Sequence, residues 1–258
     1  MRNAAQLFSA VVLALAICFA MPTLAHATLI PVVASASNNA TVQPAGPRAA
    51  INGKNFLNIE GSGNLTSSSF GVIDFSFSSL SLGGQATNVL GGTLQLTESN
   101  ASFSNPGPVS IYLSTATGVS IEPTNTGLNY NGTNNELASV DTDLGTLALL
   151  GSGSFNATGP NNNGTQDFYA MMFTGSALTA ILNTINTHGS LRLVITPDAA
   201  TTAATWTGFS LGVLAPPTIA FFAVVPEPAS ATLVGLGGLI IACRRAIGKA
   251  RFVCKELP

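Results

Sequence analysis

Residues 70–77 read FGVIDFSF, and residues 93–98 read TLQLTE. From Ile73 onward in the first stretch, and throughout the second, apolar and polar residues alternate. Side chains two residues apart lie on the same face of an extended chain, so this alternation is typical of a β-strand with one buried and one solvated face. The two stretches predict that the central part of the chain is built from β-strands.

Further strand-like stretches and turn sequences extend this prediction. Strands are expected at residues 56–59, 109–113, 144–150, 168–173, 191–196, 205–211 and 218–225. Turn-forming Gly, Asn and Pro occur at 83–84, 91–92, 105–107, 131–132 and 163–164, and the run GSGS at 151–154 is interpreted as a flexible loop. Many short strands with such turns favour an all-β fold, a β-sandwich or jelly roll, over residues 56–225. Residues 28–55 are interpreted as an extended lead-in with one edge strand at 29–34.

Residues 175–186 depart from the strand pattern and predict one short amphipathic helix. Their large apolar residues recur at helical spacing: Leu178, Ile181, Leu182 and Ile185. Ser176 can cap the start of this helix, and Gly189 can end it. We expect the helix to close one end of the sandwich, with its apolar stripe packed on the core.

The N-terminal segment predicts export. Arg2 is followed by an apolar run at residues 7–20, and Ala25-His26-Ala27 fits the small-residue pattern that signal peptidase cleaves. Residues 1–27 are therefore expected to be a signal peptide, with an uncleaved anchor helix as the alternative. Cys18, Cys243 and Cys254 all lie outside the central part, so an exported domain here folds without disulfides, and Cys254 has no assigned role.

The C-terminal segment has three parts in a fixed order. Pro226-Glu227-Pro228 is followed by an apolar run at residues 231–243 and by Arg244-Arg245. The apolar run is glycine-rich and shorter than the ~20 residues that a helix needs to cross a bilayer. We interpret residues 226–245 as a sorting segment with a marginal transmembrane helix, and 246–258 as a basic tail on the cytoplasmic side.

Charge and residue types narrow the function classes. Residues 28–225 contain three basic and nine acidic residues, a net charge of −6, so we expect no nucleic-acid partner. They contain one histidine, His188, no cysteine and no G-x-S-x-G motif, so we expect no enzyme and no cofactor. A glycan hydrolase using paired carboxylates is the remaining catalytic alternative. Asp141 and Asp143 are weak calcium candidates, with a solvated turn as the other interpretation.

Three aromatic residues have two interpretations. Trp206, the single tryptophan, and Tyr112 and Tyr169 lie in predicted strands. Flat rings on the face of a sandwich can stack on sugar rings, which would make these residues carbohydrate contacts. The alternation around Trp206 instead favours a side chain directed to the core.

The C-terminal pattern resembles the PEP-CTERM sorting signal of Gram-negative bacteria, over about the last thirty residues. The resemblance implies recognition by an exosortase, a membrane transpeptidase, and an association with exopolysaccharide and with biofilm or floc formation. Residues 70–97 also resemble the opening of DNRLRE-type jelly-roll domains of surface-attached proteins, although the motif that names those domains is absent.

These observations lead to one principal hypothesis and two alternatives. The principal one is an exported, non-enzymatic protein that is anchored in the membrane, processed by an exosortase, and then placed at the cell surface or outside the cell, with a structural or adhesive role. The alternatives are a carbohydrate-binding module and, third, the glycan hydrolase named above.

Overall fold

The computed structural model describes residues 27–99, 103–131, 140–156 and 164–227, and the side chains of residues 50–52, 64 and 65 lie outside that description. Nearly all described residues belong to one compact unit, Leu29–Val225. The other unit comprises Met1–Thr28 and Pro226–Pro258 and is almost wholly outside the described residues.

Strands predominate among the described residues. The strands in chain order are β1 (Ala27–Gln43), β2 (Gly46–Pro47), β3 (Phe56–Glu60), β4 (Phe70–Ser76), β5 (Asn88–Thr97), β6 (Gly107–Ser114), β7 (Leu147–Phe155), β8 (Gln166–Met171), β9 (Ser190–Pro197), β10 (Ala203–Thr207) and β11 (Thr218–Pro226). The helices are α2 (Ala50–Asn55), η1 (Ser62–Ser67), η2 (Thr142–Leu144) and α3 (Gly175–Asn186).

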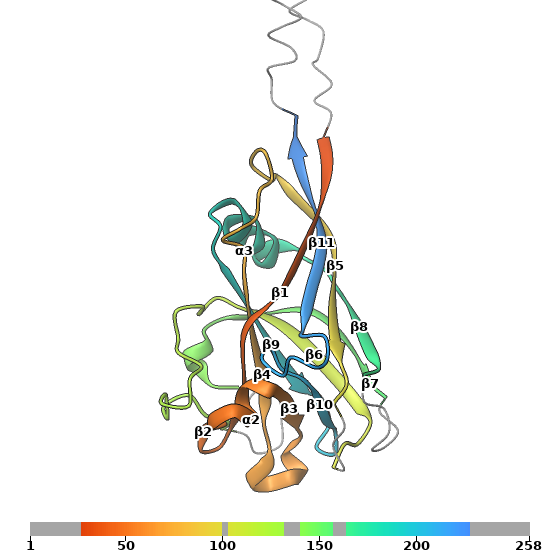
Figure 1. Ribbon diagram of the computed structural model, residues 1–258. Helices are drawn as coiled ribbons and strands as arrows, with labels where there is room; N and C mark the ends of the chain where they lie inside the picture. Colours follow the sequence, from red (N-terminus) through yellow and green to blue (C-terminus); the bar gives the residue numbers. More distant parts are fainter. Residues whose placement is uncertain (1–26, 100–102, 132–139, 157–163, 228–258) are drawn as a thin grey trace, which may run out of the picture. The chain divides into compact units, whose positions relative to one another are not determined.

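Most strands form one large sheet in the order β7-β6-β9-β4-β1-β11-β5-β8, with β2 paired to β1 (Figure 1). The sheet curls until its ends approach, because Met172 N–H, just beyond β8, donates to the carbonyl oxygen of Leu150 in β7 at 2.8 Å. A second sheet of β10 and β3 lies beside the end of β5, where Glu98 bridges to Trp206. The expected all-β sandwich is confirmed, in a form close to a barrel.

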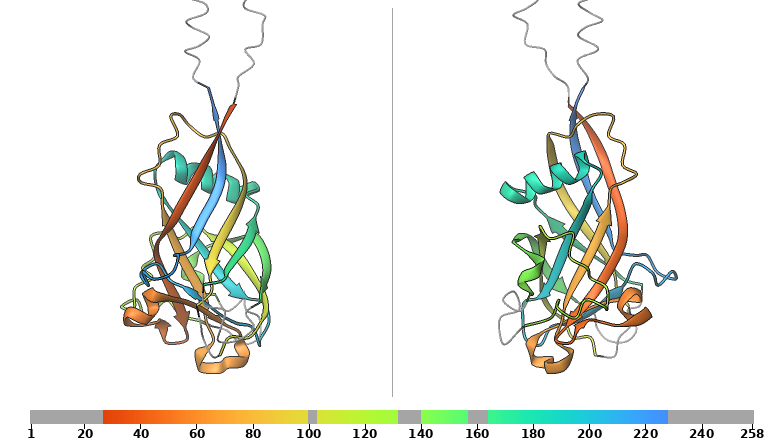
Figure 2. Two further views of the ribbon diagram at one scale, coloured as in Figure 1. Left: turned by 45° about the vertical axis from the view of Figure 1, so that its right-hand side comes forward. Right: turned by 90° about the vertical axis from the view of Figure 1, so that its left-hand side faces the viewer.

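The interior between the sheet faces is apolar and is continued by α3 (Figure 2). Ala177, Ile181 and Ile185 of α3 are buried in the main core cluster, and Leu178 and Leu182 pack partly against it. The predicted helix and its apolar stripe are therefore confirmed.

The ends of α3 differ from the sequence prediction. The N-cap residue is Thr174, not Ser176, and no side chain makes a capping hydrogen bond there. The C-cap is Thr187, whose N–H donates to the carbonyl oxygen of Asn183. His188 then reverses the chain with a φ of 56°, a left-handed conformation that a non-glycine residue rarely adopts.

A second apolar cluster covers the outer side of β4, β6 and β9. Val72, Tyr112 and Val194 point outward from these strands and pack against Leu128 and Leu144 from the long connection between β6 and β7. The outer side of β4, β6 and β9 is thus covered by other parts of the described chain.

Three segments differ from the expected strand pattern. The expected lead-in is largely a 17-residue strand, β1, which lies inside the sheet between β4 and β11. The glycine pair 91–92 continues β5 through a bulge, opposite Phe221 and Phe222, instead of ending it. The GSGS run is part of β7, because a Cβ at Gly151 would lie 2.1 Å from the carbonyl oxygen of Ala170, so the glycine permits close approach to β8.

Candidate functional site

The aromatic residues considered as sugar contacts lie in the interior, which corrects that interpretation. Trp206 is fully buried, and Tyr169 and Tyr112 expose only 3% and 9% of their surface. The indole of Trp206 packs edge-on against Phe155 and Tyr169, with ring centroids 5.3 and 6.2 Å away. A glycan in solvent cannot stack on buried rings, so these residues stabilise the core.

Asp141 and Asp143 form a turn. Both carboxylate oxygens of Asp141 accept backbone hydrogen bonds, Oδ1 from Asp143 N–H and Oδ2 from Asn129 N–H, each at 2.9 Å. Asp141 therefore caps η2, while Asp143 is exposed. Within the described ranges no group of three or more His, Cys, Asp or Glu side chains could hold a metal ion, so calcium binding remains a prediction without structural support.

A pair of carboxyl groups, Glu98 and Asp167, lies in the interior beside Trp206. The indole N–H of Trp206 donates to Asp167 Oδ2 at 2.7 Å, and the carboxyl of Glu98 donates a hydrogen bond to Asp167. Burial, the negative charge of Asp167 and this hydrogen bond raise the pKa of Glu98 to about 7. Burial also raises the pKa of Asp167, although the hydrogen bond from Trp206 opposes that effect.

The geometry of this pair does not suit glycoside hydrolysis. Catalytic carboxyl groups in that chemistry stand roughly 5 to 9.5 Å apart, so that a sugar or a water fits between them. Glu98 and Asp167 are directly hydrogen-bonded, and Glu98 is only 3% exposed. The raised pKa of Glu98 favours its protonated form inside the protein, and sequence reasoning missed this pairing because the residues are 69 positions apart in the chain.

The most distinctive surface is the outward side of β1, β11, β5 and β8, which we call the open face. Of the nine exposed large apolar side chains among the described residues, six lie on it or directly after β8: Leu29, Val33, Leu90, Phe168, Met172 and Phe222. The one charged residue in these four strands is Asp167, whose carboxylate is held inside by Trp206. The open face is therefore both apolar and uncharged.

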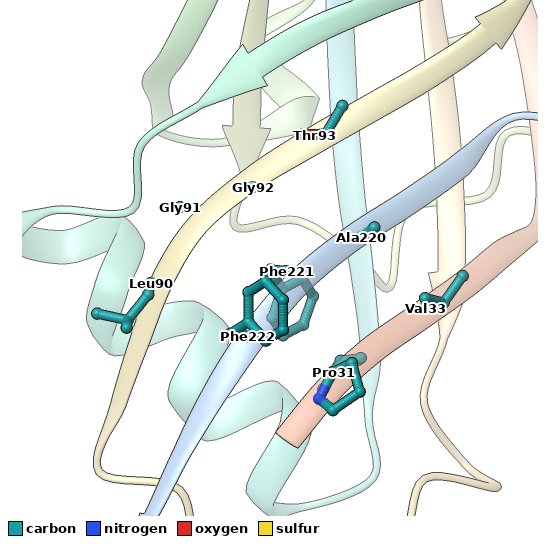
Figure 3. Close-up of a pocket in the computed structure, with 10 residues that line it drawn as sticks. Pro31, Val33, Leu90, Gly91, Gly92, Thr93, Ala220, Phe221 and Phe222 are labelled. Atoms are coloured by element: carbon teal, nitrogen blue, oxygen red, sulfur yellow. The ribbon is translucent and has the colours of Figure 1, made fainter. Parts of the chain in front are cut away.

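A hollow of about 390 Å³ lies in the open face (Figure 3). Leu90 from β5 and Phe222 from β11 line one part of it, and Pro31 and Val33 from β1 line another. Gly91 has a φ of 42°, and a Cβ there would meet no atom within 4 Å, so the glycine leaves this part of the face open. Leu90 and Phe222 are 44% and 50% exposed, which makes them available to a ligand.

Strand β11 brings Phe222 to this surface by simple alternation, because the extra residue of the bulge, Gly91, lies in β5. Ile219, Phe221, Ala223 and Val225 are buried, as simple alternation requires, but the bulge between Phe221 and Phe222 interrupts the pairing with β5. The Phe221-Phe222 doublet is the sequence signal that could have indicated an exposed aromatic ring, because two adjacent large residues in a strand cannot both face the core.

The residues of the predicted targeting signals lie mostly outside the described residues. This applies to Ala25, Pro228, Arg244 and Arg245, whereas Ala27 begins β1, Pro226 ends β11 and Glu227 is exposed. Among the residues that the structure describes, no helix is long and apolar enough to span a bilayer.

Comparisons with known proteins give little beyond the fold. No protein-family model and no curated protein matches the chain. A similar solved structure is that of Clostridium thermocellum endo-1,4-beta-D-xylanase 10B, its CBM22-1 and GH10 modules complexed with xylohexaose. The sequence identity is 9% and the TM-score 0.28, and the match covers 74% of this chain and 28% of that one, so the chain spans less than a third of that protein's length.

Proposed function

We propose that this chain is an exported, non-enzymatic protein of the cell surface or extracellular matrix of a Gram-negative bacterium, with a structural or adhesive role linked to exopolysaccharide. A signal peptide at residues 1–27 directs export in this proposal, and residues 226–245 hold the chain in the membrane until an exosortase processes it. The observation that carries the binding role is the open face, where six large apolar side chains are exposed on or directly beside strands without an outward charge, whereas the outer side of β4, β6 and β9 is covered.

The physical argument concerns water. Large exposed apolar side chains are normal when scattered, but a contiguous group of them marks a surface that another molecule covers. Each square ångström of apolar surface removed from water stabilises a complex by roughly 25 cal/mol. These four strands carry no charge except Asp167, so burial of the open face would not require the desolvation of an outward charged group.

The test compares retention of the full chain on the envelope and exopolysaccharide fraction of a PEP-CTERM-encoding host. In the double variant L90S/F222S we expect retention to fall by roughly tenfold, since interfaces depend on a few central apolar residues. Val213→Ser is the matched control, because Val213 is 81% exposed and lies outside the open face. Equal retention of the double variant and the control would refute the binding role.

Export and anchoring need a separate measurement. Cell fractionation should find the chain outside the cytoplasm, and mass spectrometry of the mature protein should find new termini near Ala27 and in residues 226–245. A full-length, unprocessed chain in the cytoplasm would contradict the targeting part of the proposal while leaving the binding part testable.

A carbohydrate-binding module is the second candidate, and the exposed rings of Phe222 and Phe168 favour it. An aromatic ring offers a flat apolar surface to the apolar side of a sugar ring, and Thr93 beside the hollow adds a hydroxyl group. Phe222→Trp and Phe222→Leu separate the two candidates. Sugar stacking requires a ring, so Trp should keep glycan retention and Leu should lose it, whereas an apolar partner should tolerate Leu.

A further inference from the structure

A second hollow, of about 300 Å³, lies apart from the open face, between the C-terminal half of α3, the start of β9 and the end of β6. We call it the hydroxyl pocket. Seven of its eleven lining residues are Ser, Thr or Asn: Ser114, Thr115, Thr117, Asn183, Thr184, Thr187 and Ser190. The remaining ones are Leu113, Ala180, Gly189 and Leu191.

The lining is polar but uncharged. None of these residues is acidic, basic or a histidine, and the two such residues adjacent to them in the chain, His188 and Arg192, do not line the pocket. A charged ligand would lose hydration here without gaining an opposite charge. The pocket therefore favours a neutral ligand that can both donate and accept hydrogen bonds, as hydroxyl and amide side chains do.

Some polar side chains of the pocket already have hydrogen-bond partners within the protein. The others are the ones that can bind a ligand. The hydroxyl of Ser114 donates to the carbonyl oxygen of Leu144 at 2.6 Å, and that of Thr187 donates to Asn183 O at 2.8 Å. Within the described part of the chain, five others make no side-chain hydrogen bond to protein: Thr115, Thr117, Asn183, Thr184 and Ser190.

One wall of the pocket is fixed by a buried cation. The guanidinium of Arg192, only 2% exposed, binds both carboxylate oxygens of Asp74 at 2.7 and 2.8 Å. Its Nη1 donates to the carbonyl oxygens of Ala116 and Val119 at 2.7 and 2.8 Å. These bonds hold the backbone on both sides of Thr117 in place. Ligand binding therefore does not pay the entropy cost of ordering this wall.

The helical wall is fixed as well. The buried Ile181 and Ile185 attach α3 to the core. The side-chain amide of Asn186 accepts from the N–H of Ala86 at 2.8 Å and donates to its carbonyl oxygen at 2.9 Å. Asn183 and Thr184 therefore lie on a helix that is held in place by its packing and hydrogen bonds.

We propose that the hydroxyl pocket binds a neutral, polyhydroxylated ligand about the size of one or two sugar rings, either a residue of a glycan or a free polyol. The volume is at the lower end for small-molecule sites, which fits a ligand of this size. Dense hydroxyl groups without an apolar platform or a counter-charge predict weak binding, with a Kd on the order of millimolar. This site is independent of the proposed function, because it shares no residue with the open face.

The test is saturation-transfer NMR on the purified full chain in a detergent without a sugar headgroup. The probes are methyl α-D-glucopyranoside, methyl β-D-galactopyranoside, a linear hexitol and the anionic methyl glucuronide. We expect transfer to the neutral probes, and less transfer to the glucuronide. Transfer to the pyranosides alone identifies a glycan residue as the ligand, and equal transfer to the hexitol identifies a free polyol.

The variants place the binding in the pocket. T117V/T184V removes one hydroxyl from each wall while keeping side-chain shape, and we expect the saturation transfer to fall about tenfold. Thr179→Val is the matched control on α3, because Thr179 is exposed and outside the pocket. No transfer to any neutral probe, or equal transfer in the double variant at an unchanged urea midpoint, overturns the proposal. L90S/F222S should leave the transfer unchanged, so failure of the proposed function does not affect this result.

Discussion

Replacing Glu98 with glutamine should remove a pH-dependent loss of stability. Glu98 is 3% exposed and hydrogen-bonded to Asp167, so ionising it places two negative charges in the interior. Glutamine has the same shape, stays neutral, and can still donate an N–H to the Asp167 carboxylate. The substitution therefore removes the titration and keeps the hydrogen bond.

The size of the effect follows from the pKa of Glu98, which is raised from 4.5 to about 7. Between these values the unfolded chain has released the proton while the folded protein still holds it, so each pH unit lowers the free energy of unfolding by about 1.4 kcal/mol. The stabilisation is complete below pH 4.5 and is lost as the pH rises through about 7. The whole change is about 3 kcal/mol, and it favours the variant at pH 8.

Urea unfolding between pH 4.5 and 8 measures this change. Trp206 is the single tryptophan, fully buried and hydrogen-bonded to Asp167, so its fluorescence reports unfolding of this region directly. The quantity to plot is the unfolding free energy of Glu98→Gln minus that of the wild type. It should be near zero at pH 4.5 and rise to about 3 kcal/mol at pH 8.

Asp143→Asn is the matched control. Asp143 is exposed, and neutralising a surface carboxylate should change the free energy of unfolding by only about 0.5 kcal/mol at any pH. If the difference between Glu98→Gln and the wild type were the same at pH 5 and pH 8, the pKa of Glu98 would not be raised in the folded state, and the description of this carboxyl pair would be wrong.

Three further substitutions test the packing. Arg192→Met should lower the free energy of unfolding by about 3 to 5 kcal/mol, because it leaves the Asp74 carboxylate without its partner. Lys54→Met is the control. It breaks the more exposed pair with Glu122, and urea titration should show a loss of less than about 1 kcal/mol. His188→Gly should raise the free energy of unfolding by about 1 kcal/mol, since glycine adopts the φ of 56° without strain; a lower thermal midpoint would contradict this. Gly151→Ala should destabilise by about 1 to 3 kcal/mol, because the added Cβ would collide with the carbonyl oxygen of Ala170, whereas Gly118→Ala, whose added Cβ would meet no atom within 4 Å, should unfold at the wild-type urea concentration.

Residue periodicity was sufficient to predict the strands and the helix whose structure depends on neighbouring residues in the chain. The alternation from Ile73 predicted β4, and the helical spacing of Leu178, Ile181 and Ile185 predicted α3 with the bounds that the structure has. In α3, and in β4 from Ile73 onward, one face is buried more deeply than the other, so the period of the sequence equals the period of the structure. The all-β fold class followed from the same repeated pattern.

The candidate sites could not be predicted because they depend on contacts between distant segments. The alternation around Trp206 favoured the core, and its burial confirms that, but the packing of its ring against Phe155 and Tyr169 joins distant segments that no local pattern relates. The raised pKa of Glu98 needs this residue, just after β5, to lie near Asp167 of β8, and no spacing along the chain encodes that proximity. The glycine-rich part of β7 looked like a loop because its reason, close approach to β8, lies in the neighbouring strand.

Strand β11 is an inner strand of the sheet and ends at Pro226, so the domain should resist a force applied to the C-terminal end of this strand. Strand β11 pairs with β5 from Thr218↔Gln95 to Val224↔Asn88, and β1 flanks its other side. A pull on the C-terminal end acts along the strand, so it loads these hydrogen bonds together in shear instead of breaking them one at a time. A protein tethered at this end while its open face holds a matrix would resist being drawn apart by flow.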